Sequence, residues 1–220
     1  ARLMVMTFPA PLADFWDRLR ITRGPPWGLT GNLVSSETDD GRVSRASRGV
    51  RLWSAKINLG IYPNRGAAGL ASRIEVMARA GSSFLAYDKG ASFPAADPDG
   101  TILGAASPTV TGLPASLHEI RLGNFPAGYV LTEGDMILVI TDTGARSLVR
   151  VVDDTVTADG TGDTGIFQIE PARLAGVKAG DAVTVIRPTA VFQVMPGSYD
   201  RGTRGVVNTS GASFTIREKR

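Results

Sequence analysis

The feature that most constrains the fold is a series of short apolar runs, each bounded by turn-forming residues. From residue 118 onward, runs rich in β-branched and aromatic side chains alternate with Gly, Pro and Asp. Such runs are too short for amphipathic helices, and their spacing is typical of the strands of a barrel or sandwich. The chain is therefore predicted to be mainly β. The expected strands read HEIRL, MILVIT, RSLVRVV, IFQIEP, AVTVIRP, AVFQVMP and ASFTIRE.

A strand, a helix and a second strand are predicted earlier in the chain. Residues 51–62 alternate in polarity, and their apolar face comprises Trp53, Ala55, Ile57, Leu59 and Ile61. Residues 66–80 have helical periodicity instead, with an apolar stripe of Ala67, Leu70, Ala71, Ile74, Met77 and Ala78. Gly81 is expected to end this helix, and SFLAYD to form the next strand. Together they indicate a small α+β unit.

The domain organisation is predicted from where these patterns stop. Residues 88–108 are rich in Ala, Gly, Pro and Asp and follow neither periodicity, so they are expected to form a linker. The last two runs, AVFQV and ASFTIRE, are expected to complete the first domain. The predicted fold class is mainly β (α+β): a sandwich-like domain of residues 1–99 and 189–220 with one helix, and an inserted small β-barrel of residues 100–188.

Two Gly-Asp pairs could be either chemical groups or turn residues. Gly134-Asp135 precedes MILVI, and Gly180-Asp181 precedes AVTVI 46 residues later. Glycine permits a positive φ, and aspartate can accept hydrogen bonds from its own turn. Because the surrounding segments match at only four of eleven positions, we interpret the pairs as a recurring barrel element and not as a true repeat.

Composition excludes several classes of function. The chain has no cysteine and one histidine, His118, which removes thiolate nucleophiles, cysteine-based zinc sites and histidine-rich metal sites. His118 is expected to be an ordinary surface or turn residue. A formal net charge of +3 is too small to indicate nucleic-acid binding. Pro9 and Pro11 interrupt the apolar start, so neither a signal peptide nor a membrane span is expected. No cofactor is expected.

Asp-Thr-Gly, the signature of aspartic peptidases, occurs at residues 142–144 and 163–165. Such enzymes need two carboxylates that share a proton, each from its own lobe or subunit. Asp142 and Asp163 are too close in sequence for two lobes, so only a homodimer using Asp142 fits. Thr141 stands where that family usually has an apolar residue. Because DTGA joins two strand-like runs, a hairpin turn is the simpler interpretation.

Two further motifs are also interpreted as turns. Gly160, Gly162 and Gly165 form a literal G-x-G-x-x-G, but a strand follows where a dinucleotide site needs a helix. A mobile hairpin tip is expected there. Asp97 and Asp99 in DPDG lack the glutamate and the flanking helices of an EF-hand, so calcium binding is not expected.

Candidate contacts with other subunits lie in the first quarter of the chain. Four arginines recur every third residue, which places them on both faces of a strand, and no aromatic residue interleaves them before Trp53. Solvated surface or salt bridges to a neighbouring subunit are therefore expected. Trp27 lies in a Pro- and Gly-rich loop where a core role is less obvious. The candidate subunit-interface residues are Trp27, Arg42, Arg45 and Arg48.

Several stretches carry a resemblance to a known family. They are the early FWDRLRI, the strand-helix-strand that ends in SFLAYD, the segment ADPDGTILG, and the closing MPGSYDRGTRGVVNTSGASFTIRE. In these stretches the sequence resembles the distal tail proteins of long-tailed bacteriophages, also called minor tail or baseplate-upper proteins, including those of prophages and gene transfer agents. The resemblance covers most of the chain and includes no catalytic motif.

The resemblance implies a structural protein and not an enzyme. In such proteins a β-rich ring-forming (belt) domain with one helix assembles as a homohexamer at the end of the tail tube, and a smaller β-barrel projects from it. The implied partners are the tail tube protein and the baseplate hub protein. The implied location is the virion tail tip, after assembly in the host cytoplasm.

The sequence also bears on other partners and on two alternative functions. No membrane and no sequence-specific nucleic acid is expected as a partner, and a host-surface saccharide stays open as a ligand of the barrel. Two alternative functions also stay open: a dimeric retropepsin-like aspartic peptidase that uses Asp142, and a saccharide-binding β-barrel protein.

Overall fold

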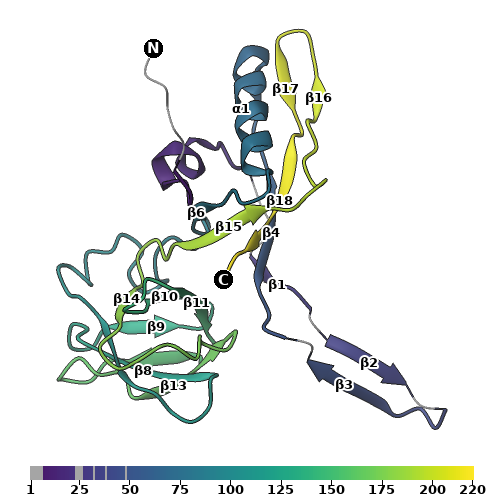
Figure 1. The fold of residues 1–220 in the computed structure, drawn as a ribbon. Helices are drawn as coiled ribbons and strands as arrows, with labels where there is room; N and C mark the ends of the chain where they lie inside the picture. Colours follow the sequence, from purple (N-terminus) through teal and green to yellow (C-terminus); the bar gives the residue numbers. More distant parts are fainter. Residues whose placement is uncertain (1–6, 23–26, 32, 38, 48) are drawn as a thin grey trace. The chain divides into compact units, whose positions relative to one another are not determined.

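The computed structural model describes residues 7–22, 27–31, 33–37, 39–47 and 49–220. The chain divides into two compact units (Figure 1). Unit 1 consists of Ala1–Gly28, Ser54–Gly90 and Thr189–Arg220, and unit 2 consists of Leu29–Trp53 and Ala91–Pro188. The described chain is mainly β, with several sheets and one closed barrel, which confirms the predicted fold class.

Unit 1 is built on a five-stranded sheet in the order β1-β4-β18-β15-β6. Strand β18 pairs antiparallel with β4 on one side and with β15 on the other, and β15 pairs with β6. The sheet thus joins segments from the two ends of the chain. Its strands are β1 (Gly28–Leu29), β4 (Trp53–Asn58), β6 (Phe84–Ala86), β15 (Ala190–Val194) and β18 (Ser213–Glu218).

Strand β4 confirms most of the predicted alternation. Its apolar residues are buried, namely Trp53, Ala55 and Ile57. Ile61, which was assigned to the same face, is instead 61% exposed. The strand ends at Asn58, so the two-residue period no longer fixes the side on which Ile61 lies.

Helix α1 spans Asn64–Met77, which begins two residues before the predicted range of 66–80 and ends three residues earlier. Ile74 and Met77 are buried, whereas Leu70 on the same stripe is only half-buried. The apolar stripe is therefore covered only towards its C-terminal end. Gly81 follows the helix with a φ of 83°, a conformation that glycine adopts without steric penalty.

A small sheet that was not predicted, β16-β17-β5, lies beside α1 in unit 1 (Figure 1). Its strands have two or three residues each, which is too short for an alternating pattern to show in the sequence. They are β5 (Tyr62–Pro63), β16 (Thr203–Arg204) and β17 (Asn208–Ser210).

Aromatic side chains fix the N-terminal segment of unit 1 on the sheet. This segment contains two short 3-10 helices, η1 (Leu12–Asp14) and η2 (Trp16–Arg18). Phe15 contacts Phe84 edge to face with 4.7 Å between ring centroids, and Trp16 stacks near Phe84 at 6.0 Å. All three rings are almost completely buried. Each such pair contributes roughly 1 kcal/mol beyond the area it buries.

Unit 2 contains a closed barrel in the order β10-β11-β13-β8-β7-β14, in which every pair of neighbouring strands is antiparallel. Alternate side chains point inward and form one apolar core, to which Ile120, Ile137, Val149 and Phe167 belong. The strands are β7 (Thr109–Gly112), β8 (Glu119–Gly123), β10 (Met136–Ile140), β11 (Arg146–Val151), β13 (Ile166–Glu170) and β14 (Ala182–Thr184).

Five of these barrel strands coincide with predicted runs, and β7 does not. Two short strands beside the barrel, β9 (Val130–Thr132) and β12 (Thr155–Thr157), were also not predicted. They pair antiparallel with one another. Unit 2 further contains a hairpin of β2 (Leu33–Glu37) and β3 (Val43–Ser47).

The barrel has a twofold relation between its halves. One half consists of β7, β8 and β10, and the other of β11, β13 and β14. Exchanging β7 with β11, β8 with β13 and β10 with β14 leaves every strand with the same neighbours in the barrel. The two Gly-Asp pairs occupy equivalent places in these halves. Each glycine N–H donates to a valine carbonyl of the other half, and the same valine N–H donates to the aspartate carbonyl: Gly134-Asp135 with Val151, and Gly180-Asp181 with Val110.

Both Gly-Asp pairs are turn residues, which confirms the interpretation from the sequence. Both glycines have a φ of 93°. In each turn the aspartate carboxylate accepts a hydrogen bond from the N–H three residues earlier: Thr132 to Asp135 at 2.8 Å, and Lys178 to Asp181 at 2.7 Å. Asp135 also accepts the Ala95 N–H at 2.9 Å. These carboxylates therefore hold the backbone of the barrel.

The predicted linker is instead a strap of turns, residues 91–106, that belongs to unit 2. Asp97 is fully buried in it, and its carboxylate accepts the N–H groups of Ile102 and Leu103, each at 3.0 Å. The Leu103 side chain joins the barrel core. The Tyr129 hydroxyl donates to Asp97 at 3.3 Å, and burial together with Asp97 raises the pKa of Tyr129. Carboxylate-to-backbone bonds follow no periodic pattern, so the sequence does not reveal such a strap.

Replacing Asp135 by alanine is expected to lower the free energy of unfolding by about 2 kcal/mol, because two part-buried N–H groups lose a charged acceptor. Asp181→Ala should cost less, since Asp135 also holds the strap through Ala95. Urea denaturation of both variants measures the difference. Glu133→Ala, in the same turn but exposed, is the matched control. Equal effects of all three substitutions would contradict this account of the turns.

Candidate functional site

Asp142 lies in the turn of the β10–β11 hairpin, as the simpler interpretation had it. The Thr141 N–H donates to the Ala145 carbonyl at 2.9 Å, which closes the turn. The side chain of Asp142 is 57% exposed and lies 3.1 Å from the Lys178 ammonium group. The hydrogen bond and charge of Lys178 lower the pKa of Asp142. An exposed carboxylate that is paired with a lysine differs from a peptidase carboxylate, which shares a proton with a second one.

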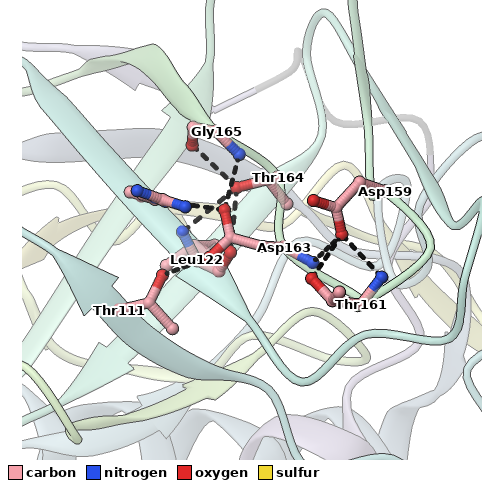
Figure 2. Close-up of polar contacts among 8 residues, drawn as sticks. Thr111, Leu122, Asp159, Thr161, Asp163, Thr164 and Gly165 are labelled. Carbon is pink, nitrogen blue, oxygen red and sulfur yellow. Dashed lines mark hydrogen bonds and ion pairs between the residues drawn. The ribbon is translucent and has the colours of Figure 1, made fainter.

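Residues 159–165 form a hydrogen-bonded loop where a mobile hairpin tip was expected. Asp159 Oδ1 accepts three hydrogen bonds: from the Thr161 N–H at 2.8 Å, from the Thr161 hydroxyl at 2.7 Å and from the Asp163 N–H at 3.1 Å. Figure 2 shows these contacts on one side of the loop. The backbone of the glycine-rich segment is thus fixed by a side chain of its own, as in other Asx turns.

Asp163 ties the same loop to the barrel wall (Figure 2). Its carboxylate accepts hydrogen bonds from Arg121 on β8 at 2.6 Å, from Thr111 on β7 at 3.1 Å and from the Gly165 N–H at 2.9 Å. Burial raises the pKa of Asp163, but these hydrogen bonds together outweigh burial and hold the pKa below its ordinary value. The described residues contain no group of three or more His, Asp or Glu side chains that could hold a metal ion.

The second Asp-Thr-Gly is therefore a structural element, and its pH dependence can be predicted. Because the folded pKa of Asp163 lies below the ordinary value of 3.8, its stabilisation is present at neutral pH and is lost as the pH falls through the folded pKa. Asp163→Asn should be less stable than the wild type at pH 7, and the gap should close as the pH falls below about 3.8. Urea unfolding at pH 7, 5, 4 and 3 measures this gap; a gap that is constant with pH would contradict the assignment.

His118 takes part in a cluster of ionisable side chains at the surface of unit 2. Its Nδ1 lies 3.0 Å from one carboxylate oxygen of Glu170, and the Arg51 guanidinium lies 2.8 Å from the other. The side chain of His118 is 56% exposed. The cluster connects the start of β8, the end of β13 and the segment after β3. Exposed ion pairs of this kind contribute little stability each.

The structure places Trp27 in the core of unit 1. Its ring is 4% exposed and contacts Phe192 edge to face with 4.6 Å between centroids. Trp16 contacts the Trp27 ring edge to face, with 6.2 Å between centroids. Trp27 was a candidate for contact with another chain, but its ring has little surface left for one. The Pro- and Gly-rich surroundings suggested exposure because they contain no periodic pattern that indicates burial.

The arginine candidates belong to the β2–β3 hairpin, which we call the arm (residues 33–47). Arg42 is exposed and pairs with Asp40 at 3.4 Å, and the backbone of Arg45 lies in β3 opposite Ser35. Arg48 lies outside the described residues. Strands β2 and β3 pair with each other in a sheet of two strands. Of the described arm side chains, Val34 is half-buried and the others are exposed.

A second exposed feature, absent from the predictions, is the turn between β16 and β17, which we call the valine tip (residues 205–207). Val206 is 99% exposed and Val207 is 69% exposed. Asn64, the first residue of α1, holds this tip from beneath: its amide side chain donates to the carbonyls of Gly205 at 3.1 Å and Val206 at 3.0 Å, and its N–H donates to the Val207 carbonyl at 3.0 Å.

The valine tip combines a fixed backbone with solvent-exposed apolar side chains. Single exposed apolar residues are common on protein surfaces, whereas adjacent ones form an apolar patch that is available for contact with another surface. The sequence did contain a signal, since two valines interrupt an otherwise polar stretch in RGTRGVVNTS. Their exposure was not predictable, because the same pair would be buried in a longer strand.

A groove of about 410 Å³ lies in unit 1 between α1 and the β16–β17 hairpin. Its lining includes Leu70 and Ala71 from the half-covered stripe of the helix, together with Tyr62 and Tyr199. Its charged lining residues are Glu75, which pairs with Arg201 at 2.7 Å, and the exposed Arg204. The incomplete burial of the helix is thus explained: its N-terminal half lines a groove and not the core.

Comparison with known proteins adds no family to these observations. No family model matches the chain, and no curated protein is similar to it at a significant level. Among the described residues, no helix has the length and apolar character that crossing a bilayer requires.

Proposed function

We propose that the chain is a structural subunit of a virion tail, which forms a homohexameric ring that connects the tail tube to the baseplate hub. The valine tip carries the proposal, because it presents apolar surface on a backbone that is held rigid by Asn64. A rigid apolar protrusion loses little conformational entropy on binding, so it favours association with another chain. The phage-tail assignment within this class rests on the sequence resemblance.

The arm supports the same proposal. A two-stranded hairpin without its own core is only marginally stable in water, so a partner surface is the expected source of its order. The arm, the groove and the valine tip are three different surfaces, and a ring needs such heterologous contacts because each subunit meets its two neighbours with different faces.

The carboxylates that suggested chemistry have structural roles in the described part of the chain. Asp135 and Asp181 close turns, Asp97 holds the strap, and Asp163 ties a loop to the barrel wall. Each of these groups is thereby a hydrogen-bond acceptor for the fold itself. Ring assembly depends on the shape of the contact surfaces and needs no reacting group, which agrees with the structural roles of these carboxylates.

The purified 220-residue chain is expected to form rings with sixfold averages in negative-stain images and a hexamer mass in light scattering. The double variant Val206→Asp/Val207→Asp should lose the rings while its urea midpoint stays within experimental error, since both side chains are exposed. Val152→Asp, at a valine that is 42% exposed in unit 2, is the matched control and should keep the rings.

Two outcomes would overturn this proposal. A wild-type chain that stays a monomer at high concentration would contradict ring formation. Rings that persist in the double variant would show that the valine tip is not the contact that assembly needs.

A further inference from the structure

The turn of the arm carries a concentration of negative charge. Glu37 ends β2, and Asp39 and Asp40 follow it in the turn; all three are exposed, and Arg42, the single described cation of the turn, pairs with Asp40. We call Glu37, Asp39 and Asp40 the acidic turn. Asp39 and Glu37 form no ion pair within the described chain. Such a cluster on a thin hairpin is self-repelling unless cations of another surface face it.

The groove of unit 1 offers cations of the required kind. Arg201 and Arg204 are three residues apart, beside and on β16; both line the groove and both are exposed. Arg201 already pairs with Glu75 at 2.7 Å, whereas Arg204 forms no ion pair within the described chain. Strand β16 is also the edge of the small sheet, because the order β16-β17-β5 gives it one strand neighbour. An edge strand can accept a further strand from another chain through its backbone groups.

We infer that the acidic turn of one copy docks in the groove of a neighbouring copy, with its carboxylates against Arg204 and beside the Arg201–Glu75 pair. Apolar contact with Leu70, Ala71 and Tyr199 would then complete the burial of the helix stripe. The contact is heterologous, since the arm and the groove are different surfaces of the same chain. A contact of this type, repeated around an axis, closes a ring when the rotation between neighbouring copies closes. This inference rests on the proposed ring function and names one contact of that ring.

Three properties of the two surfaces agree with this pairing. Their charges are opposite in sign, which favours the correct orientation during encounter. The groove volume of about 410 Å³ lies within the range of pockets that bind ligands of side-chain size and larger. The arm is a narrow two-stranded element whose described side chains are mostly exposed, so it has surface available to enter a groove.

Site-specific cross-linking tests the contact directly, because the chain has no cysteine of its own. Asp39 and Arg204 are suitable positions, since both are exposed. The double variant Asp39→Cys/Arg204→Cys, treated with a short bismaleimide, is expected to give a ladder of dimers, trimers and higher multimers on denaturing gels. A mixture of the two single variants should stop at a heterodimer. Asp39→Cys/Lys219→Cys, with an exposed lysine outside the groove lining, is the control and should give no ladder.

Charge exchange provides a second, independent measurement. Arg204→Glu should weaken self-association in sedimentation experiments roughly tenfold or more, because it places like charges opposite one another. Adding Asp39→Arg to the same chain should restore most of the association. Lys219→Glu and Glu133→Lys are exposed controls with the same charge changes and should have no effect.

The outcomes separate this inference from the proposed function. Sixfold rings without a ladder, and without an effect of Arg204→Glu, would overturn the docking of the acidic turn and leave the ring intact. A ladder without sixfold rings in images would support the docking and overturn the hexameric ring. Capture of the acidic turn by a tail tube or hub protein, with no self-cross-link, would also overturn the inference.

Discussion

The structure of unit 1 depends on antiparallel pairing between strands from opposite ends of the chain. Strand β18 is sandwiched between β4 and β15, so the sheet cannot form until the C-terminal strands have returned after residue 188. Each backbone hydrogen bond contributes only about 1 kcal/mol net, but leaving these groups buried without partners would cost more. The rings of Phe15, Trp16 and Trp27 pack on this sheet through Phe84 of β6 and Phe192 of β15, so their packing requires the sheet to be formed.

In unit 2 the backbone groups of the barrel strands are paired within one continuous segment of the chain, residues 109–184. Its barrel closes on itself, so its strands have no exposed edge, and its two halves use the same Gly-Asp turn at equivalent places. The buried carboxylates are positioned as acceptors for backbone N–H groups, which makes them part of the fold. Motifs that suggested chemistry in the sequence therefore have a common structural explanation: short β segments need strong turn acceptors where the chain reverses.

At the surfaces for which we propose a role in assembly, a hydrogen-bonded backbone carries exposed side chains. Asn64 fixes the valine tip from beneath, and the groove beside it leaves half of a helix stripe uncovered. Such features lower the stability of an isolated chain slightly and favour association, because less conformational freedom is lost on contact. The proposed role in assembly rests on these features.

The sequence by itself determined the mainly β character, the position of the helix, five of the barrel strands and the role of the Gly-Asp pairs. Each of these is encoded locally, in a period of two or 3.6 residues or in the turn chemistry of glycine and aspartate. Only the tertiary structure decided that Trp27 is buried, that residues 91–106 form a strap around Asp97, and that Val206 is exposed. Burial of a loop residue depends on partners that are distant in sequence, such as Phe192 for Trp27, and no local pattern records them.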